Sequence, residues 1–141
     1  MRYAEEIERI LCGYVVEACM LPFAGELMGS KLSRSNWRQY YLQDAIYFDQ
    51  YCRTLARAID SDTSFECRQQ IAQLLHTCLV TYQPALLEAC ERLGIQEAHV
   101  RTTAAQPACT SYVSHLARIA RTRSALTICS ALIPCSVGYV R

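Results

Sequence analysis

The chain has 141 residues, of which 52% are apolar and 19% are charged, and its formal net charge is +1. This composition is typical of a soluble globular domain that buries a core. The near-neutral charge argues against a nucleic-acid partner, which requires a clustered basic excess. Arg118, Arg121 and Arg123 do cluster, but no aromatic residues interleave them, so a solvated helix end is favoured.

The nine cysteines do not resemble a disulfide or zinc framework. No C-x-x-C pair and no histidine pair at ligand spacing occurs, so no metal site is predicted. All but Cys109, which lies in a predicted loop, fall inside apolar helical patterns. Reduced cysteines used as small core residues, after an acidic N-terminus that does not resemble a secretory signal, indicate a cytoplasmic protein.

The first two predicted elements are amphipathic helices. Apolar residues recur at helical spacing over residues 3–20, and Pro22 disfavours helical geometry in Leu21. A short connection through Gly25 and Gly29 follows. The second helix is predicted to begin near Ser33 or Ser35 and to run to about residue 59.

The third helix is predicted over residues 63–93. Thr63 and Glu66 form a potential capping box at its start, and Gly94 suits the left-handed position after its end. Pro84 lies inside this range, so we expect a kink or break there.

Residues 95–109 are predicted to be a polar loop, and two more helices are predicted over residues 110–121 and 124–140. The last segment is uncharged but contains serine, threonine, proline and glycine, so a helix buried among others is favoured over a membrane span. With no alternating pattern of useful length, the five segments predict an all-α helical bundle.

Asp44 is the most unusual residue in the second helix. It interrupts an inward-facing stripe that is otherwise aromatic or aliphatic and that includes Tyr47. A buried carboxylate without partners costs several kcal/mol or becomes protonated, so a cation, tyrosine hydroxyls or a polar ligand must satisfy it. The alternative is a partly covered face where Asp44 reaches solvent, and periodicity alone does not separate the two.

Cys135 follows Pro134 in the last helix and shares a face with Tyr139. Pro134 removes one backbone hydrogen bond, so we expect a bend just before the thiol. Such a thiol is a nucleophile only if a base or a positive dipole stabilises its thiolate. Local sequence alone favours a structural cysteine.

Four segments, in matching order and separation, resemble motifs of the TenA family. Residues 21–27 are similar to its His-Pro-Phe segment, and residues 37–47 are similar to its F-x-x-Y-x-x-Q-D-x-x-Y helix. Residues 110–116 resemble its Y-T-x-Y/H-L/M helix start, and residues 131–139 resemble its A-L-L-P-C-x-W-x-Y signature. Since these segments span nearly the whole chain, the sequence is identified as a member of this family.

The resemblance implies a haem-oxygenase-like bundle, usually a homotetramer, that requires no cofactor. It implies a thiamine-salvage hydrolase (thiaminase II type) that releases ammonia from 4-amino-5-aminomethyl-2-methylpyrimidine and also cleaves thiamine. By carry-over, Cys135 is the nucleophile that adds to the pyrimidine ring. Asp44 binds the amino and nitrogen edge of the ring, Tyr112 contacts a ring nitrogen, and Tyr47 and Tyr139 line the pocket.

Three features depart from the family pattern. Leu21 replaces a frequent histidine, and Gln83-Pro84 interrupts a helix that is usually continuous. The chain ends two residues after Tyr139, whereas family members continue through helices that supply another tyrosine and a proton-transferring glutamate. We therefore expect residues 1–141 to be a single domain, the N-terminal portion of the family fold.

Two other functions are alternatives to this hydrolase, and the sequence features support only the first of them. One is a catalytically inactive, truncated paralogue that binds an aminopyrimidine, or a helical fragment with a structural role only. The other is an oxidase of the PQQ-synthesis type, which depends on several pocket histidines. His76, His99 and His115 are too scattered in the sequence to support it.

Overall fold

The computed structural model describes the backbone of residues 2–140 and the side chains of residues 5–7 and 9–135. Over the described backbone the chain is helical and contains no strand, so the all-α prediction is confirmed. The elements are α1 (Arg2–Cys19), α2 (Pro22–Met28), α3 (Arg34–Ile59), α4 (Phe65–Thr77), the π-helical turn η1 (Cys78–Tyr82), α5 (Gln83–Arg92), α6 (Glu97–Thr102), α7 (Pro107–Ala120) and α8 (Ala125–Val140).

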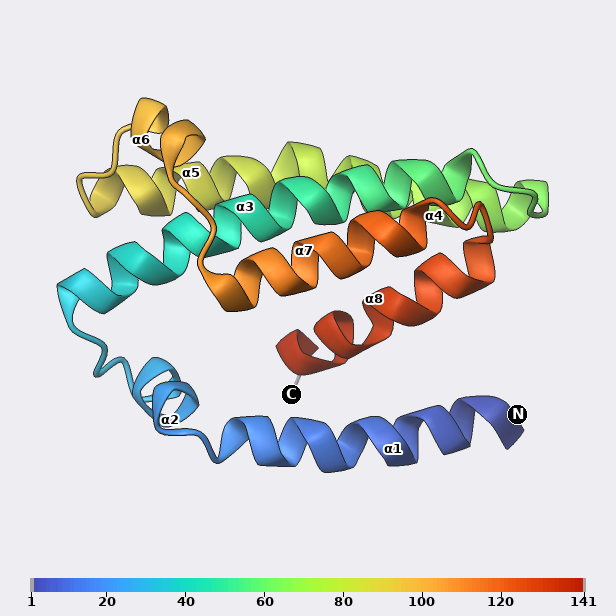
Figure 1. Cartoon of the computed structure of the whole chain (residues 1–141), viewed down its shortest axis with the longest axis horizontal. Helices are drawn as coiled ribbons and strands as arrows, with labels where there is room; N and C mark the ends of the chain where they lie inside the picture. Colours follow the sequence, from blue (N-terminus) through green and yellow to red (C-terminus); the bar gives the residue numbers. More distant parts are fainter. Residues whose placement is uncertain (1, 141) are drawn as a thin grey trace. The chain divides into compact units, whose positions relative to one another are not determined.

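The chain divides into two compact units. The larger unit is Arg34–Ala131, in which the long helix α3 packs against α7 and also against α4 and α5 (Figure 1). Helices α3 and α7 run in the same direction, because residues 43, 47 and 60 of the first segment contact residues 106, 112 and 123 of the second. Their carboxyl ends therefore lie at the same end of the unit.

The core of the larger unit lies along this helix pair. Leu55 of α3 is 1% exposed, and Leu116 of α7 is fully buried. Thr54 is also fully buried, and its hydroxyl donates to the carbonyl oxygen of Gln50 at 2.8 Å. The buried threonine is thus satisfied within its own helix, and apolar contacts dominate the rest of the interface.

The smaller unit consists of Met1–Ser33 and Leu132–Arg141. Pro22 ends α1 as predicted, and it then occupies the first turn of α2, where its missing N–H has no intrahelical partner to lose. The predicted short connection is therefore partly helical. No single described helix is long and apolar enough to cross a membrane; α1 from Glu5 and α2 meet the length and composition test only as a pair bent by 81°.

The predicted third helix is two helices joined by η1. Gln83 donates its backbone N–H to the carbonyl of Cys78, five residues back, just before Pro84. Pro84 has no N–H to offer Val80, and the wider π turn accommodates the missing bond. The cap at the start of α4 is Ser64, whose hydroxyl accepts from Cys67 N at 3.2 Å, so the predicted capping box at Thr63 is wrong by one residue.

The end of α5 follows the prediction for Gly94. Its φ is +72°, its N–H donates to Glu91 O at 2.8 Å, and Ile95 N donates to Cys90 O at 2.9 Å. This is a Schellman motif, and it turns Ile95 back onto Cys90 and Leu42 in a buried cluster.

The predicted polar loop at 95–109 is wrong. Residues Glu97–Thr102 form α6, and α7 begins at Pro107 rather than at 110, so Cys109 is helical. Pro107 stands in the first turn of α7 and fixes a helical φ there. The polar composition of this stretch predicts a loop, whereas Pro107 within it begins a helix.

Candidate active site

The face of α3 predicted to turn inward is covered along most of its length. Tyr51 and Leu55 are buried, and Asp44 and Tyr47 are half-buried. Asp44 and Tyr47 are three residues apart and so share a face of the helix. Near the start of α3, Trp37 stacks on Tyr41 with ring centroids 5.7 Å apart. The stripe is therefore an aromatic surface with one carboxylate in its middle.

Tyr112 of α7 joins this surface. Its ring stacks on that of Tyr47, with centroids 5.5 Å apart and an interplanar angle of 24°. Tyr47 also lies 5.8 Å from Tyr51. Two residues far apart in sequence, both predicted to bind substrate, are therefore in direct contact across the α3–α7 interface.

Asp44 lies among thiols as well as rings. Burial, and secondly the Asp44 charge, raise the pKa of Cys90 on α5. The same two causes, in the same order, raise the pKa of Cys109 on α7. Asp44 is thus within electrostatic reach of thiols on both helices that pack against α3 here. A carboxylate there is an acceptor for N–H donors, such as the exocyclic amine of a heterocycle.

Gln43 holds the start of α7 against α3. Its side-chain amide donates to Ala104 O at 3.2 Å and accepts from Gln106 N at 2.7 Å. In addition, the Cys109 thiol donates to the Gln43 carbonyl oxygen at 3.6 Å. These bonds fix the register that brings Tyr112 to Tyr47. The sequence identifies Gln43 only as the glutamine of the Q-D motif and gives it no role, because its partners are backbone groups, which residue types do not reveal.

Cys135 is half-buried on α8, directly after the exposed Pro134, and the helix is continuous through that proline. It belongs to the smaller unit, whereas Asp44, Tyr47 and Tyr112 belong to the larger one. The side chain of Tyr139 lies outside the described residues. The structure therefore brings together three of the five predicted site residues.

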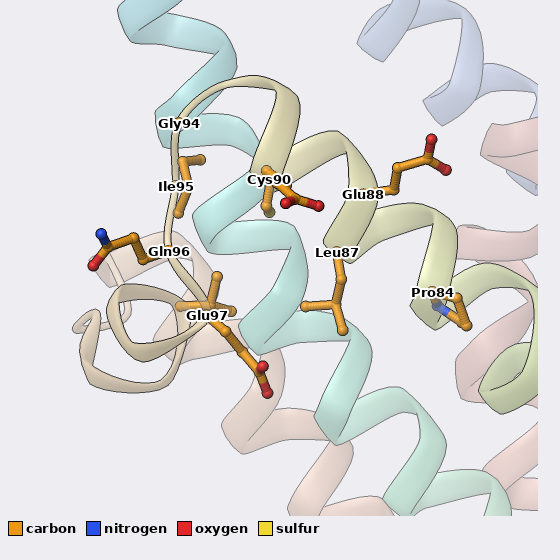
Figure 2. Close-up of a pocket in the computed structure, with 10 residues that line it drawn as sticks. Pro84, Leu87, Glu88, Cys90, Gly94, Ile95, Gln96 and Glu97 are labelled. Carbon is orange, nitrogen blue, oxygen red and sulfur yellow. The ribbon is translucent and has the colours of Figure 1, made fainter.

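Two hollows border this region of the larger unit. One, of about 750 Å³, lies between α5 and α6, and Figure 2 shows the carboxylates of Glu88 and Glu97 beside it. Ile95 and Cys90 line it, but Asp44 and Tyr47 do not. The other, of about 770 Å³, lies along α7 and is bordered by Tyr112, together with residues such as His115 and Arg118. Only the second hollow therefore involves a predicted binding residue.

Among the described residues, no group of three or more His, Cys, Asp or Glu side chains is arranged to hold a metal ion. His76 and His99 are exposed, and His115 Nδ1 lies 3.0 Å from Arg118 Nη2. The three histidines stand on α4, α6 and α7 and do not form the cluster that an oxidase of the PQQ-synthesis type would use.

A profile described as the TENA/THI-4/PQQC family matches residues 16–141. The chain belongs to this family. Among curated relatives, an uncharacterized protein of Haemophilus influenzae is 26% identical over 119 residues, which are 84% of this chain and 55% of that protein. An aminopyrimidine aminohydrolase of Halalkalibacterium halodurans is 26% identical over 120 residues, which are 84% of this chain and 53% of that enzyme.

The TenA resemblance is therefore confirmed at the level of the family. This chain spans about half the length of the two curated relatives. The roles of Cys135, Asp44, Tyr47, Tyr112 and Tyr139 stay predictions.

Proposed function

We propose that this TenA-family chain serves thiamine salvage by hydrolysing 4-amino-5-aminomethyl-2-methylpyrimidine. The observation that carries the proposal is the contact between Tyr47 and Tyr112 beside the half-buried Asp44. An apolar surface with a few convergent polar groups suits a small flat heterocycle. The name of the Halalkalibacterium halodurans relative, an aminopyrimidine aminohydrolase, supports the same class of substrate.

The geometry limits how the pyrimidine binds in this proposal. Inserting a ring between Tyr47 and Tyr112 requires centroids about 7 Å apart, twice the usual carbon–carbon contact distance. Their centroids are 5.5 Å apart, so the substrate packs against an outer face or an edge of the pair. The Asp44 carboxylate then accepts hydrogen bonds from the ring's amino group, which fixes its orientation.

The proposed chemistry replaces an amine by a hydroxyl. The Cys135 thiolate adds to a ring carbon, and the electrons displaced into the ring expel the protonated aminomethyl nitrogen as ammonia. Water adds to the exocyclic carbon left behind and loses a proton, after which the thiolate departs and the ring regains its aromaticity. The sum is aminomethyl pyrimidine plus water giving hydroxymethyl pyrimidine plus ammonia, with no oxidant or cofactor consumed.

A second candidate is an aminopyrimidine-binding protein without turnover. It is favoured by one observation: Asp44, Tyr47 and Tyr112 all lie in the larger unit, whereas Cys135 belongs to the smaller one. The binding surface in this candidate forms without the thiol. It predicts tight pyrimidine binding that replacement of Cys135 leaves unchanged.

Ammonia release from the aminomethyl pyrimidine separates the two candidates. We expect turnover by the wild-type chain, background rates for Cys135→Ser, and near wild-type rates for Cys129→Ser. Cys129 is a matched control because it is also half-buried on α8. Circular dichroism verifies that each variant is folded. Binding without turnover in a folded wild-type chain would support the binding protein. An absence of both binding and turnover would reject both candidates.

A further inference from the structure

A third hollow of the larger unit lies at the opposite end of the α3–α7 pair. It has a volume of about 560 Å³, within the range of small-ligand sites. Ala56, Ala117 and Ala120 contribute to its lining, and their small side chains leave the space between the helices open. Four arginines line it as well: Arg53 and Arg57 from α3, and Arg121 and Arg123 from the end of α7 and the turn after it.

The four guanidinium groups are not neutralised by strong ion pairs. Arg53 lies 2.7 Å from Asp49, and Arg123 lies 3.6 Å from Asp60. Both pairs are exposed, and exposed pairs contribute only about 0–1 kcal/mol each. The side chains of Arg57 and Arg121 have no hydrogen-bond or ion-pair partner among the residues whose side chains are described. Either group is therefore available to a ligand.

The negative carboxyl ends of the two helices offset only part of the positive charge of these arginines. The carboxyl ends of α3 and α7 lie together, and each is equivalent to roughly half a negative charge. Four arginines less Asp49 and Asp60 leave two positive charges, so the two helix ends still leave a surplus of about one. An anion can use that surplus and compete with two weak ion pairs for the remaining guanidinium groups.

Arg123 occupies a backbone conformation that disfavours it. Its φ is +54°, in the left-handed region, which costs a non-glycine residue about 1–2 kcal/mol. Glycine or asparagine would make this turn with less strain. The observed residue instead directs a cation to the same hollow as Arg57 and Arg121.

We propose that this arginine groove binds the phosphate group of a soluble small molecule. Arginine presents a planar fork of donors that matches phosphate oxygens, and several such forks converge here from two helices. The groove is distinct from the aminopyrimidine surface. Asp44 and Arg57 are separated by about 20 Å along α3, at 1.5 Å per residue. The inference therefore does not depend on the proposed hydrolase activity.

Calorimetric titration with inorganic pyrophosphate, and then with inorganic phosphate, tests this site in the full chain at constant ionic strength. We expect saturable binding to the wild-type chain. The double variant Arg57→Gln/Arg121→Gln should bind about a hundredfold more weakly, roughly tenfold for each charged hydrogen-bonding group removed. The control Arg34→Gln/Arg68→Gln makes the same change in net charge at exposed positions outside the groove and should bind as the wild type does.

A conservative pair protects the test against misfolding. Arg57→Lys/Arg121→Lys keeps the charge but removes the fork, and intermediate affinity is expected. Equal weakening in the control pair would overturn the proposal, because the effect would then belong to net charge. So would an absence of binding to the wild type, which would leave a solvated helix end. Binding only to anionic vesicles or only to a polynucleotide would also overturn it, because both carry phosphate on a macromolecular surface.

Discussion

The two ends of the α3–α7 pair use opposite kinds of chemistry. At the amino end, directed contacts join the two helices: the Gln43 amide forms hydrogen bonds with the backbone just before α7, and the Tyr47 ring stacks on the Tyr112 ring. At the carboxyl end, Arg57 and Arg121 line an open groove and have no side-chain partner among the described side chains. At the first end, directed contacts define the register of the two helices. The second end packs through buried apolar residues such as Ala58 and Leu116, and its surface carries charge that is available to a ligand.

Truncation of the shared core should have the largest effect, because both ends depend on it. Leu116 is fully buried, and Leu116→Ala should lower the free energy of unfolding by about 3 kcal/mol through lost burial and a cavity. Urea titration followed by circular dichroism measures this. Leu126→Ala removes the same atoms from a side chain that is 79% exposed, and a loss of similar size there would contradict the assigned core.

The stability of the chain at alkaline pH tests the burial of Cys52, which lies on α3 between the two ends of the helix pair. Burial, with smaller contributions from Cys78 and Asp49, raises the pKa of Cys52 from 9.0 to about 11. The folded state therefore holds the thiol proton more tightly than the unfolded state. Its contribution to stability should be constant below about pH 9 and should be lost as pH rises toward about pH 11, by about 2 kcal/mol.

Unfolding measured at pH 8 and pH 11 isolates that contribution when the wild type is compared with Cys52→Ala. The variant should lose less stability than the wild type between these pH values. Cys19→Ala, at an exposed thiol, should behave as the wild type. Identical pH dependence in all three proteins would show that the Cys52 thiol has the same pKa in the folded and unfolded states.

The amino end depends on the Gln43 amide. Gln43→Leu should destabilise the chain by about 1–2 kcal/mol, since two hydrogen bonds to the backbone are lost. It should also reduce the near-ultraviolet circular dichroism of tyrosine as α7 loses its register. Gln39→Leu, at an exposed position one turn earlier in α3, is the matched control. An equal response from both variants would mean that Gln43 does not fix the register.

The smallest change in the free energy of unfolding is expected at the carboxyl end, where one substitution should raise stability instead of lowering it. Arg123→Gly should raise the free energy of unfolding by about 0.5 kcal/mol, because relief of the left-handed strain exceeds the loss of a weak ion pair and the added chain entropy. Arg121→Gly, where φ is −76°, should lower stability by a similar amount. Thermal unfolding distinguishes the two signs, and destabilisation by both variants would contradict the assigned strain.

The amino end could be predicted from sequence because it carries motifs. The aromatic stripe, Asp44 and the resemblance at residues 37–47 indicated this surface, and periodicity predicted α3 and α8 closely. The carboxyl end could not be predicted, because Arg53 and Arg57 are far in sequence from Arg121 and Arg123 and meet only when α3 and α7 pack in parallel. Sequence placed α6 in a loop for a local reason: a helix of six residues shows too little periodicity to be recognised.

The central claim is that the amino end of the α3–α7 pair binds an aminopyrimidine through Asp44. Calorimetric titration of the aminomethyl pyrimidine into the folded wild type, Asp44→Asn and Asp49→Asn tests it most directly. Asp49 is an exposed carboxylate on the same helix and serves as the control. We predict binding to the wild type and to Asp49→Asn, and affinity lower by about tenfold or more in Asp44→Asn, where the carboxylate no longer accepts a charge-assisted hydrogen bond. Equal affinity in all three proteins, or no binding to the wild type, would contradict the claim.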